Sequence, residues 1–207
     1  MSGRFLSLEG GEGAGKSTQA RLLAEALEVR GIHVVLTREP GGTEGAEAIR
    51  DLLMQGAVNR WSAHAEALLF AAARADHVEK LIRPAVESGS WVICDRYIDS
   101  TRAYQGVQDI DDAAILALHG FGSKGLLPDR TFFLDLPEGA AAERAHARDG
   151  GVHDRFGARG PDFHAAVAAQ FRRIAAAEPE RVRVIDASRE KSNVTASLLD
   201  ALADLLP

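Results

Sequence analysis

The 207-residue sequence has little of what secreted and membrane proteins depend on. It contains a single cysteine, Cys94, so no internal disulfide can form, which is typical of a protein from a reducing compartment. Cys94 closes the apolar run Trp91–Cys94, and this position predicts a buried thiol rather than a nucleophile. The first residues, Met1–Arg4, carry no signal-peptide pattern. Together these features predict a cytoplasmic protein.

Long apolar segments and an excess of positive charge are also missing. The longest alanine- and leucine-rich run, Ala65–Ala73, contains Glu66 and is followed by Arg74, so it is too short and too charged to span a bilayer. Acidic residues (30) outnumber lysines and arginines (24), which gives a formal net charge of −6. This charge argues against nucleic acid or an anionic membrane as a partner.

The composition, 46% hydrophobic and 26% charged residues, predicts one globular domain over residues 1–207. Short apolar segments have the pattern of buried strands at 5–8, 33–37, 91–94, 131–136 and 182–186. Helical spacing occupies 16–30, 44–55, 63–83, 111–118, 138–148, 163–177 and 194–206, and Pro84 is expected to kink or end the third helix. This alternation predicts an α/β fold: a five-stranded parallel sheet with helices on both faces.

A phosphate-binding motif follows the first predicted strand and opens the first predicted helix. Gly10–Ser17 matches G-x-x-x-x-G-K-[ST], in which glycines let backbone N–H groups surround a phosphate chain. Lys16 supplies a charge for the β and γ phosphates, and the Ser17 hydroxyl suits Mg²⁺. The motif predicts a bound nucleoside triphosphate with Mg²⁺ as the cofactor, and by itself it is shared by GTPases, ATPases, metabolite kinases and some ligases. The candidate nucleotide-binding residues are Gly10, Gly11, Glu12, Gly13, Ala14, Gly15, Lys16, Ser17 and Thr18.

Two further junctions at the carboxyl ends of predicted strands carry charged residues. Asp95 and Arg96 follow the third strand, where a carboxylate can hold Mg²⁺ through water and a guanidinium can grip a phosphate. Arg38–Thr43 follows the second strand. Phe70 and Arg74 have the i, i+4 spacing that puts both on one face of a helix.

The runs Ile93–Gln105, Thr37–Thr43 and Leu69–Arg74 resemble the motifs of the thymidylate kinase family, and the resemblance extends from Phe5 to about Asp186. It implies a P-loop kinase fold with a short lid at about 149–161. It also implies transfer of the γ-phosphoryl group of ATP to dTMP, giving dTDP and ADP in dTTP synthesis, by a homodimer.

The resemblance also implies roles for individual residues. Phe70 would stack on thymine, Arg74 and Thr101 would read its edge, and Tyr104 would fill the space of a ribose 2′-OH. Taken singly, Phe70 is more typical of a core residue and Arg74 of a solvated surface charge. The candidate acceptor-binding residues are Glu39, Pro40, Phe70, Arg74, Arg96, Ser100, Thr101, Tyr104 and Gln105, and the candidate metal-binding residues are Ser17 and Asp95.

Arginines in or beside the lid are candidates for stabilising the transferring phosphoryl group: Arg144, Arg148, Arg155 and Arg159. Arg155 is preferred because Asp154–Arg155 resembles the lid pair of the family. The sequence departs from the family at Gly157, where related lids often carry a glutamate. With Arg155, the candidate catalytic residues are Lys16, Arg38, Arg96 and Glu12, and no covalent intermediate is expected.

Three other functions share parts of this pattern. A kinase for another nucleoside monophosphate would differ at the base-reading positions Phe70, Arg74, Thr101 and Tyr104. A P-loop switch or binding module predicts an N-K-x-D run for guanine, and the sequence has none. An ATP-dependent ligase of the dethiobiotin-synthesis type would lack the D-R-Y-x-x-S-x-x-A-Y-Q run that begins at Asp95.

Overall fold

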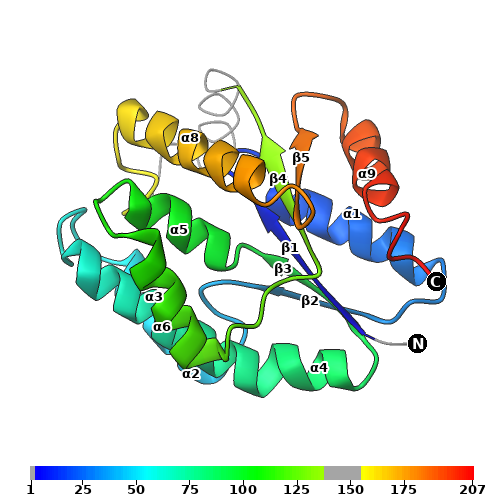
Figure 1. The fold of residues 1–207 in the computed structure, drawn as a ribbon, viewed down its shortest axis with the longest axis horizontal. Coiled ribbons are helices and arrows are strands. Elements are labelled where there is room, and N and C mark those ends of the chain that lie inside the picture. Colours follow the sequence, from blue (N-terminus) through cyan, green and yellow to red (C-terminus); the bar gives the residue numbers. More distant parts are fainter. Residues whose placement is uncertain (1–2, 138–154) are drawn as a thin grey trace.

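The computed structural model describes residues 3–137 and 155–207 and has a five-stranded parallel sheet at its centre (Figure 1). The strand order is β2-β3-β1-β4-β5, and every neighbouring pair is parallel. The carboxyl ends of the strands therefore meet at one edge, where open α/β sheets bind ligands. The strands are β1 (Arg4–Glu9), β2 (Val34–Arg38), β3 (Trp91–Asp95), β4 (Arg130–Asp135) and β5 (Val182–Asp186).

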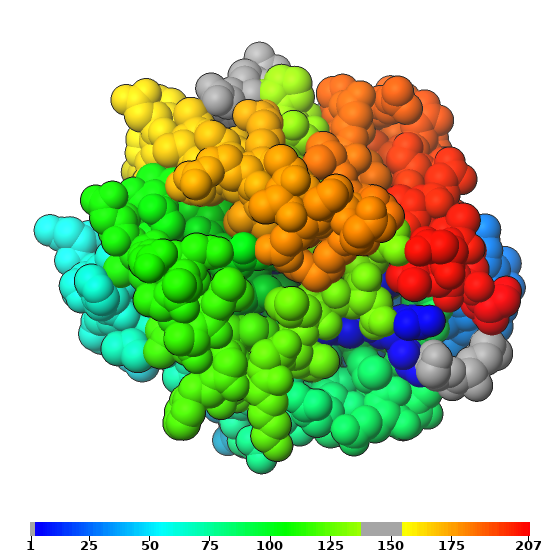
Figure 2. All heavy atoms as spheres, in the orientation of Figure 1, coloured from blue at the N-terminus to red at the C-terminus, as the bar shows by residue number. Residues whose placement is uncertain are grey.

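Successive side chains of each strand point to opposite faces of the sheet, and a separate layer of helices packs against each face. Leu6 and Leu8 of β1 pack with α1 (Lys16–Glu28) and α9 (Lys191–Asp200), whereas Phe5 packs with residues of the opposite layer. Figure 2 is viewed from the side of that layer, whose teal, green, yellow and orange atoms occupy much of the visible face. Its elements are α3 (Ala63–His77), η1 (Val78–Ile82), α4 (Arg83–Glu87), α5 (Ile98–Gly106), α6 (Asp112–Ser123) and α8 (Pro161–Ala177), and α2 (Glu44–Met54) packs on α3.

The α/β fold and the parallel sheet are thus as predicted, but several helices differ. The helix predicted over 63–83 is α3 followed by a π-helical turn, η1, and α4. Pro84 does not end it, because proline in the first turn of α4 needs no N–H donor. The final helix spans Lys191–Asp200 rather than 194–206. The predicted helix over 138–148 lies outside the described residues.

Helix α5 was not predicted, because its buried face is polar. Asp99, Arg102 and Gln105 are buried beside Ala103 and Tyr104, so the run lacks an apolar stripe. Cys94 is fully buried as predicted, and burial raises the pKa of its thiol well above the usual value. Among the described residues, no helix is long and apolar enough to cross a membrane.

Candidate active site

The turn between β1 and α1 needs glycine at three positions, Gly10, Gly13 and Gly15. Gly10 has φ 142° and Gly15 has φ 88°, both in the range that L side chains rarely adopt. A Cβ atom at Gly10 would lie 2.7 Å from the carbonyl oxygen of Leu134. The loop therefore lies tightly against β4 and carries the N-terminus of α1, which favours an anion.

Lys16 and Ser17 lie at the start of α1, inside this turn. The Nζ atom of Lys16 is nearly buried and donates to the carbonyl oxygen of Gly11 at 2.8 Å. Burial, and next the charge of Arg96, lower the pKa of Lys16 to about 8. The Ser17 hydroxyl donates to Oδ2 of Asp95 at 2.5 Å. The ammonium group of Lys16 and the Ser17–Asp95 hydrogen-bonded pair therefore lie together where the P-loop meets the end of β3.

Arg96 connects this loop to the neighbouring strand end. Its backbone is left-handed, with φ 69°, which is costly for a residue other than glycine and is typical of functional sites. Its guanidinium donates to the carbonyl oxygen of Gly10 at 3.0 Å, to Glu12 at 2.6 Å and to Ser100 Oγ at 3.2 Å. Three of the predicted residues, Glu12, Arg96 and Ser100, are thus in direct contact.

A buried carboxylate organises the predicted base-reading residues. Glu39 accepts a hydrogen bond from Arg74 Nε at 2.8 Å and contacts His77 Nδ1 at 3.1 Å. Arg74 also donates to Thr101 Oγ1 at 2.8 Å. Glu39 and Arg74 are 5% and 2% exposed, so neither is a surface charge. Glu39 fixes the guanidinium that would read a base.

Arg38, in contrast, is accessible. Its side chain is 54% exposed and forms a two-pronged pair with Glu47, each oxygen 3.0 Å from Nη2. Nearby, Arg50 donates to the carbonyl oxygen of Pro40 at 2.9 Å. Arg38 and the partly buried Arg96 line the same cavity, where two guanidinium groups suit an anion.

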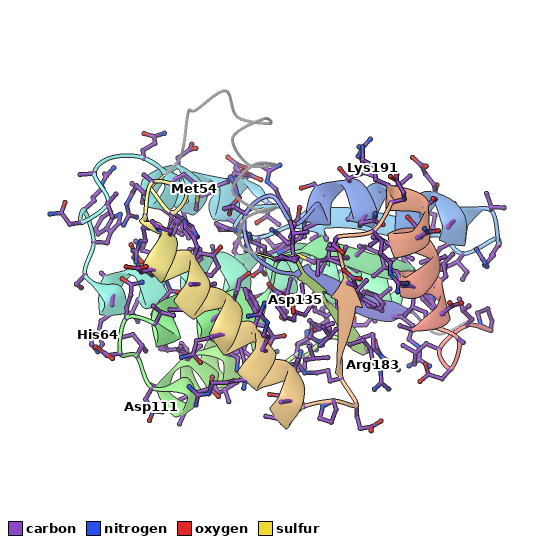
Figure 3. The ribbon with its side chains drawn as sticks, turned by 90° about the horizontal axis from the view of Figure 1, so that it is seen from above. Met54, His64, Asp111, Asp135, Arg183 and Lys191 are labelled. Atoms are coloured by element: carbon purple, nitrogen blue, oxygen red, sulfur yellow. The ribbon has the colours of Figure 1, made fainter. Side chains whose placement is uncertain are left out.

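These groups line one cavity of about 260 Å³, close to the lower end of the usual range for small-molecule pockets. All nine predicted acceptor-binding residues line it, as do Glu12, Lys16, Ser17, Arg38 and Asp95. Sequence reasoning missed four lining residues: Arg50, Met54, Tyr97 and Phe156. Figure 3 shows Met54 at the end of α2, close to the yellow segment that leads into α8.

Arg155, the preferred lid arginine, is not among the residues that line this cavity. Its guanidinium is buried and donates to three backbone carbonyl oxygens and to Glu66. Arg159 also approaches Glu66, at 3.4 Å. The structure therefore does not bring Arg155 to the P-loop, because its donors are engaged elsewhere. Arg144 and Arg148 lie outside the described residues.

The donor set fits a magnesium ion that arrives with a nucleotide. Mg²⁺ prefers oxygen ligands and is commonly held by one or two carboxylates together with substrate phosphates. Ser17 Oγ and Asp95 supply such oxygens beside Lys16. Within residues 3–137 and 155–207, no group of three histidine, cysteine or acidic side chains could hold a metal by itself.

The fold and the cavity define a class. A P-loop on a parallel sheet opens into a cavity whose lining combines arginines with aromatic rings. This is the arrangement of a P-loop kinase whose acceptor carries both a phosphate and a flat ring.

Comparison with known proteins identifies the member of this class. The thymidylate kinase family model matches residues 8–198. The chain is 60% identical to a thymidylate kinase of Rhizorhabdus wittichii, with full coverage of both chains, and 49% identical to one of Caulobacter vibrioides, covering 99% of this chain and 98% of that one. A crystal structure of thymidylate kinase from Ehrlichia chaffeensis is similar with a TM-score of 0.80 at 35% identity, covering 98% of this chain and 100% of that one. The chain belongs to the thymidylate kinase family.

Proposed function

We propose an assignment of residues to the reaction of this family. As a thymidylate kinase, the chain transfers the γ-phosphoryl group of ATP to dTMP and releases dTDP and ADP. The observation that carries the assignment is the junction at Arg96. One guanidinium contacts the P-loop carbonyl of Gly10 and the acceptor-side hydroxyl of Ser100, so it stands between donor and acceptor phosphates.

On the donor side, the P-loop amides and Lys16 bind the β and γ phosphates of ATP. Lys16 can exchange its bond to the Gly11 carbonyl for phosphate oxygens without a large movement. Ser17 and Asp95 would hold Mg²⁺, which, when bound, neutralises charge on the transferring group. The adenine is assigned to the loop 187–189 after β5, and Gln19 of α1 donates to the backbone carbonyl oxygen of nearby Lys191.

On the acceptor side, Arg38 and Arg96 hold the phosphate of dTMP. Phe70 stacks on thymine, and Arg74 with Thr101 reads its edge, because Glu39 orients Arg74 toward Thr101. Tyr104, against the deoxyribose, and Gln105, beside the base, line the same cavity. Glu12 is paired with Arg96. The resemblance to the family implies that Glu12 contacts the acceptor sugar or the metal shell.

The reaction needs no covalent intermediate and no strong general base, because a phosphate dianion is already nucleophilic. A phosphate oxygen of dTMP attacks the γ-phosphorus in line while Lys16, Arg38 and Arg96 stabilise the charge on the transferring group. Arg155 is retained in this role only as a prediction from sequence, since its guanidinium is bound to Glu66. The homodimer and the cytoplasmic location also remain predictions.

The assignment is tested by measuring ADP release with dTMP, dUMP, dCMP, UMP and AMP as acceptors. We expect dTMP to give the highest kcat/KM. In Lys16→Ala, turnover should fall by at least about a hundredfold while the Kd for dTMP changes far less, because Lys16 acts on the donor phosphates. Best turnover with AMP or dCMP would instead favour a kinase for another nucleoside monophosphate. Near-normal turnover of the variant would remove Lys16 from the mechanism.

A further inference from the structure

The carboxylate of Glu66 on α3 is fully buried and does not line the cavity. It nevertheless contacts residues from two segments that do contribute to the cavity lining, α5 and the segment before α8. From α5 and the residues after it, Gln105 Nε2 and Gln108 Nε2 each lie 3.3 Å from Oε2. From the segment before α8, Arg155 Nη2 donates to Oε1, and Arg159 Nη2 lies 3.4 Å from both oxygens. Four side chains from two segments thus converge on one carboxylate.

Arg155 also forms hydrogen bonds with a third segment, which consists of the end of α2 and the loop after it. Its Nη1 donates to the carbonyl oxygen of Leu53 at 2.8 Å, Nε to that of Ala57 at 3.0 Å, and Nη2 to that of Val58 at 3.1 Å. Carbonyl groups at a helix C-terminus attract a cation. The planar fork of arginine can satisfy several acceptors at once, which lysine cannot do.

Phe156 follows Arg155 in the chain and is a wall of the cavity. Its ring centre is 5.3 Å from the Arg155 guanidinium carbon and 5.5 Å from that of Arg159. The same ring packs on Phe70 at 5.7 Å and on Tyr104 at 6.1 Å. The two guanidinium groups that Glu66 binds therefore fix the ring that stands beside the predicted base-stacking residue.

Glu66 also fixes the orientation of an amide in the cavity lining. A carboxylate between two guanidinium groups only accepts hydrogen bonds, so Gln105 has to turn its NH₂ group toward Glu66. The amide oxygen of Gln105 then has no hydrogen-bond partner in the described part of the chain. Without the negative charge, both ends of this amide could face residue 66.

We propose that Glu66 is a positioning residue for the nucleoside monophosphate pocket. Through Arg155 and Arg159 it sets the position of Phe156, and through a direct bond it sets the orientation of Gln105. The proposal rests on the assignment of this cavity to dTMP. Removing the carboxylate leaves buried guanidinium groups without a counterion, which displaces them from their present positions. None of the contacts described for Glu66 reaches the P-loop, so the effect belongs to the acceptor pocket.

The test is the steady-state kinetics of the full-length Glu66→Gln variant, with dTMP and ATP varied separately. We expect the KM for dTMP to rise about tenfold or more, while kcat and the KM for ATP change less than about threefold. Glu79→Gln is the matched control, because Glu79 is an exposed carboxylate that follows α3 in η1. This control should leave both KM values unchanged.

Arg155→Lys tests the same connection and covers the case in which Glu66→Gln folds poorly. Lysine keeps the charge but cannot reach three carbonyl oxygens and Glu66 together, so the KM for dTMP should rise as it does in Glu66→Gln. The effect on kcat is read from Glu66→Gln alone, because Arg155 is also a candidate catalytic residue. Trp61, in the loop that Arg155 contacts, gives a readout independent of activity, since its fluorescence should shift while that of buried Trp91 stays constant.

Two results would overturn the proposal. One is a KM for dTMP within about twofold of the wild type in folded Glu66→Gln and Arg155→Lys. The other is a rise in the KM values of both substrates by the same factor, which is what a general loss of structure produces. A failure of the underlying assignment has a different signature: the wild-type chain itself would show no saturable dependence on dTMP.

Discussion

Lys16 is a buried cation in the P-loop, and its ionisation is set by its surroundings. Burial, followed by the charge of Arg96, lowers its pKa to about 8, so part of the population is neutral near this pH. Phosphates of a bound nucleotide favour the charged amine and raise the pKa again. Nucleotide binding at about pH 8 should therefore take up a proton, and the affinity should fall as the pH rises through 8.

Calorimetric titration with a non-hydrolysable ATP analogue measures this uptake, because the observed heat then depends on the ionisation enthalpy of the buffer. Lys16→Arg is the control, since arginine stays charged at this pH. Equal heats for the wild type in two buffers of different ionisation enthalpy would contradict the lowered pKa.

Glu9, at the end of β1, is a second buried ionisable residue, and no motif in the sequence pointed to its role. Its oxygens bind the backbone N–H of Tyr97 at 2.7 Å and the Ser100 hydroxyl at 2.5 Å, so it holds the start of α5 beside Arg96. Burial, and next the charge of Asp99, raise its pKa to about 8. The folded protein therefore retains a proton that the unfolded chain releases above pH 4.5.

The sign of the pH effect follows from this difference. Glu9 makes folding progressively less favourable as the pH rises from about 4.5 to about 8, whereas glutamine stays neutral. We expect Glu9→Gln to gain stability relative to the wild type over this window, by on the order of 1 kcal/mol or more. Urea unfolding at several pH values measures the difference, and a constant difference would show that Glu9 is ionised in the folded protein.

Helix α5 carries much of the acceptor pocket, and ion pairs hold it in place. Asp99 is fully buried and pairs with Arg181 at 2.7 Å and Arg102 at 3.0 Å. Arg102 reaches Asp112 of α6 at 2.8 Å and Glu178 after α8 at 2.6 Å. Burial alone would raise the pKa of Asp99, but the bonds and charges of Arg181 and Arg102 hold it below the usual value.

Removing the Arg181 guanidinium should therefore lower the stability of the packing between α5, α6 and α8. Arg181→Met leaves the buried Asp99 carboxylate with one partner fewer, and we expect a loss of about 3 kcal/mol in the free energy of unfolding. The control is Arg183→Met on β5, because Arg183 pairs with the exposed Glu180 and should lose less than about 1 kcal/mol. Denaturant unfolding compares them, and equal losses would show that the Asp99 network contributes no more than a surface pair.

Among the helices and strands, those with a periodic apolar pattern were predicted from the sequence, and α5, which lacks such a pattern, was missed. The strands and α1 follow from periodic Leu, Val and Ile, because their burial needs no partner other than apolar surface. Helix α5 has polar residues on its buried face, and their burial depends on Asp112, Glu178 and Arg181, which lie on other elements. No local pattern contains that information.

The whole molecule leaves apolar side chains exposed on α3 and α6. Leu68, Leu116 and Phe121 are 56%, 37% and 93% exposed, and the two helices pack against each other. The resemblance to thymidylate kinases predicts a homodimer, and these side chains are the part of the surface that a second copy would cover. We therefore expect the protein in solution to have a molecular mass of twice that of the 22.1 kDa chain.

Light scattering coupled to size exclusion measures the mass directly. Phe121→Asp should shift the population toward the monomer, because a buried charge at an interface is costly. Val29→Asp is the control, since Val29 is 89% exposed at the end of α1, in the opposite helical layer. A monomeric wild type would contradict the predicted homodimer.

The sequence alone determined the phosphate-binding loop, the α/β fold and most, but not all, of the residues that line the cavity. This was possible because each motif is a short contiguous run whose backbone geometry and side-chain chemistry are fixed locally. Tertiary structure decided the rest: that Glu39, Glu9 and Glu66 are buried, and that Arg155 binds Glu66 rather than the P-loop. Burying a polar or charged group is favourable only with a hydrogen-bonding partner, and these partners lie 35 to 91 residues away in the chain, beyond the reach of any local pattern.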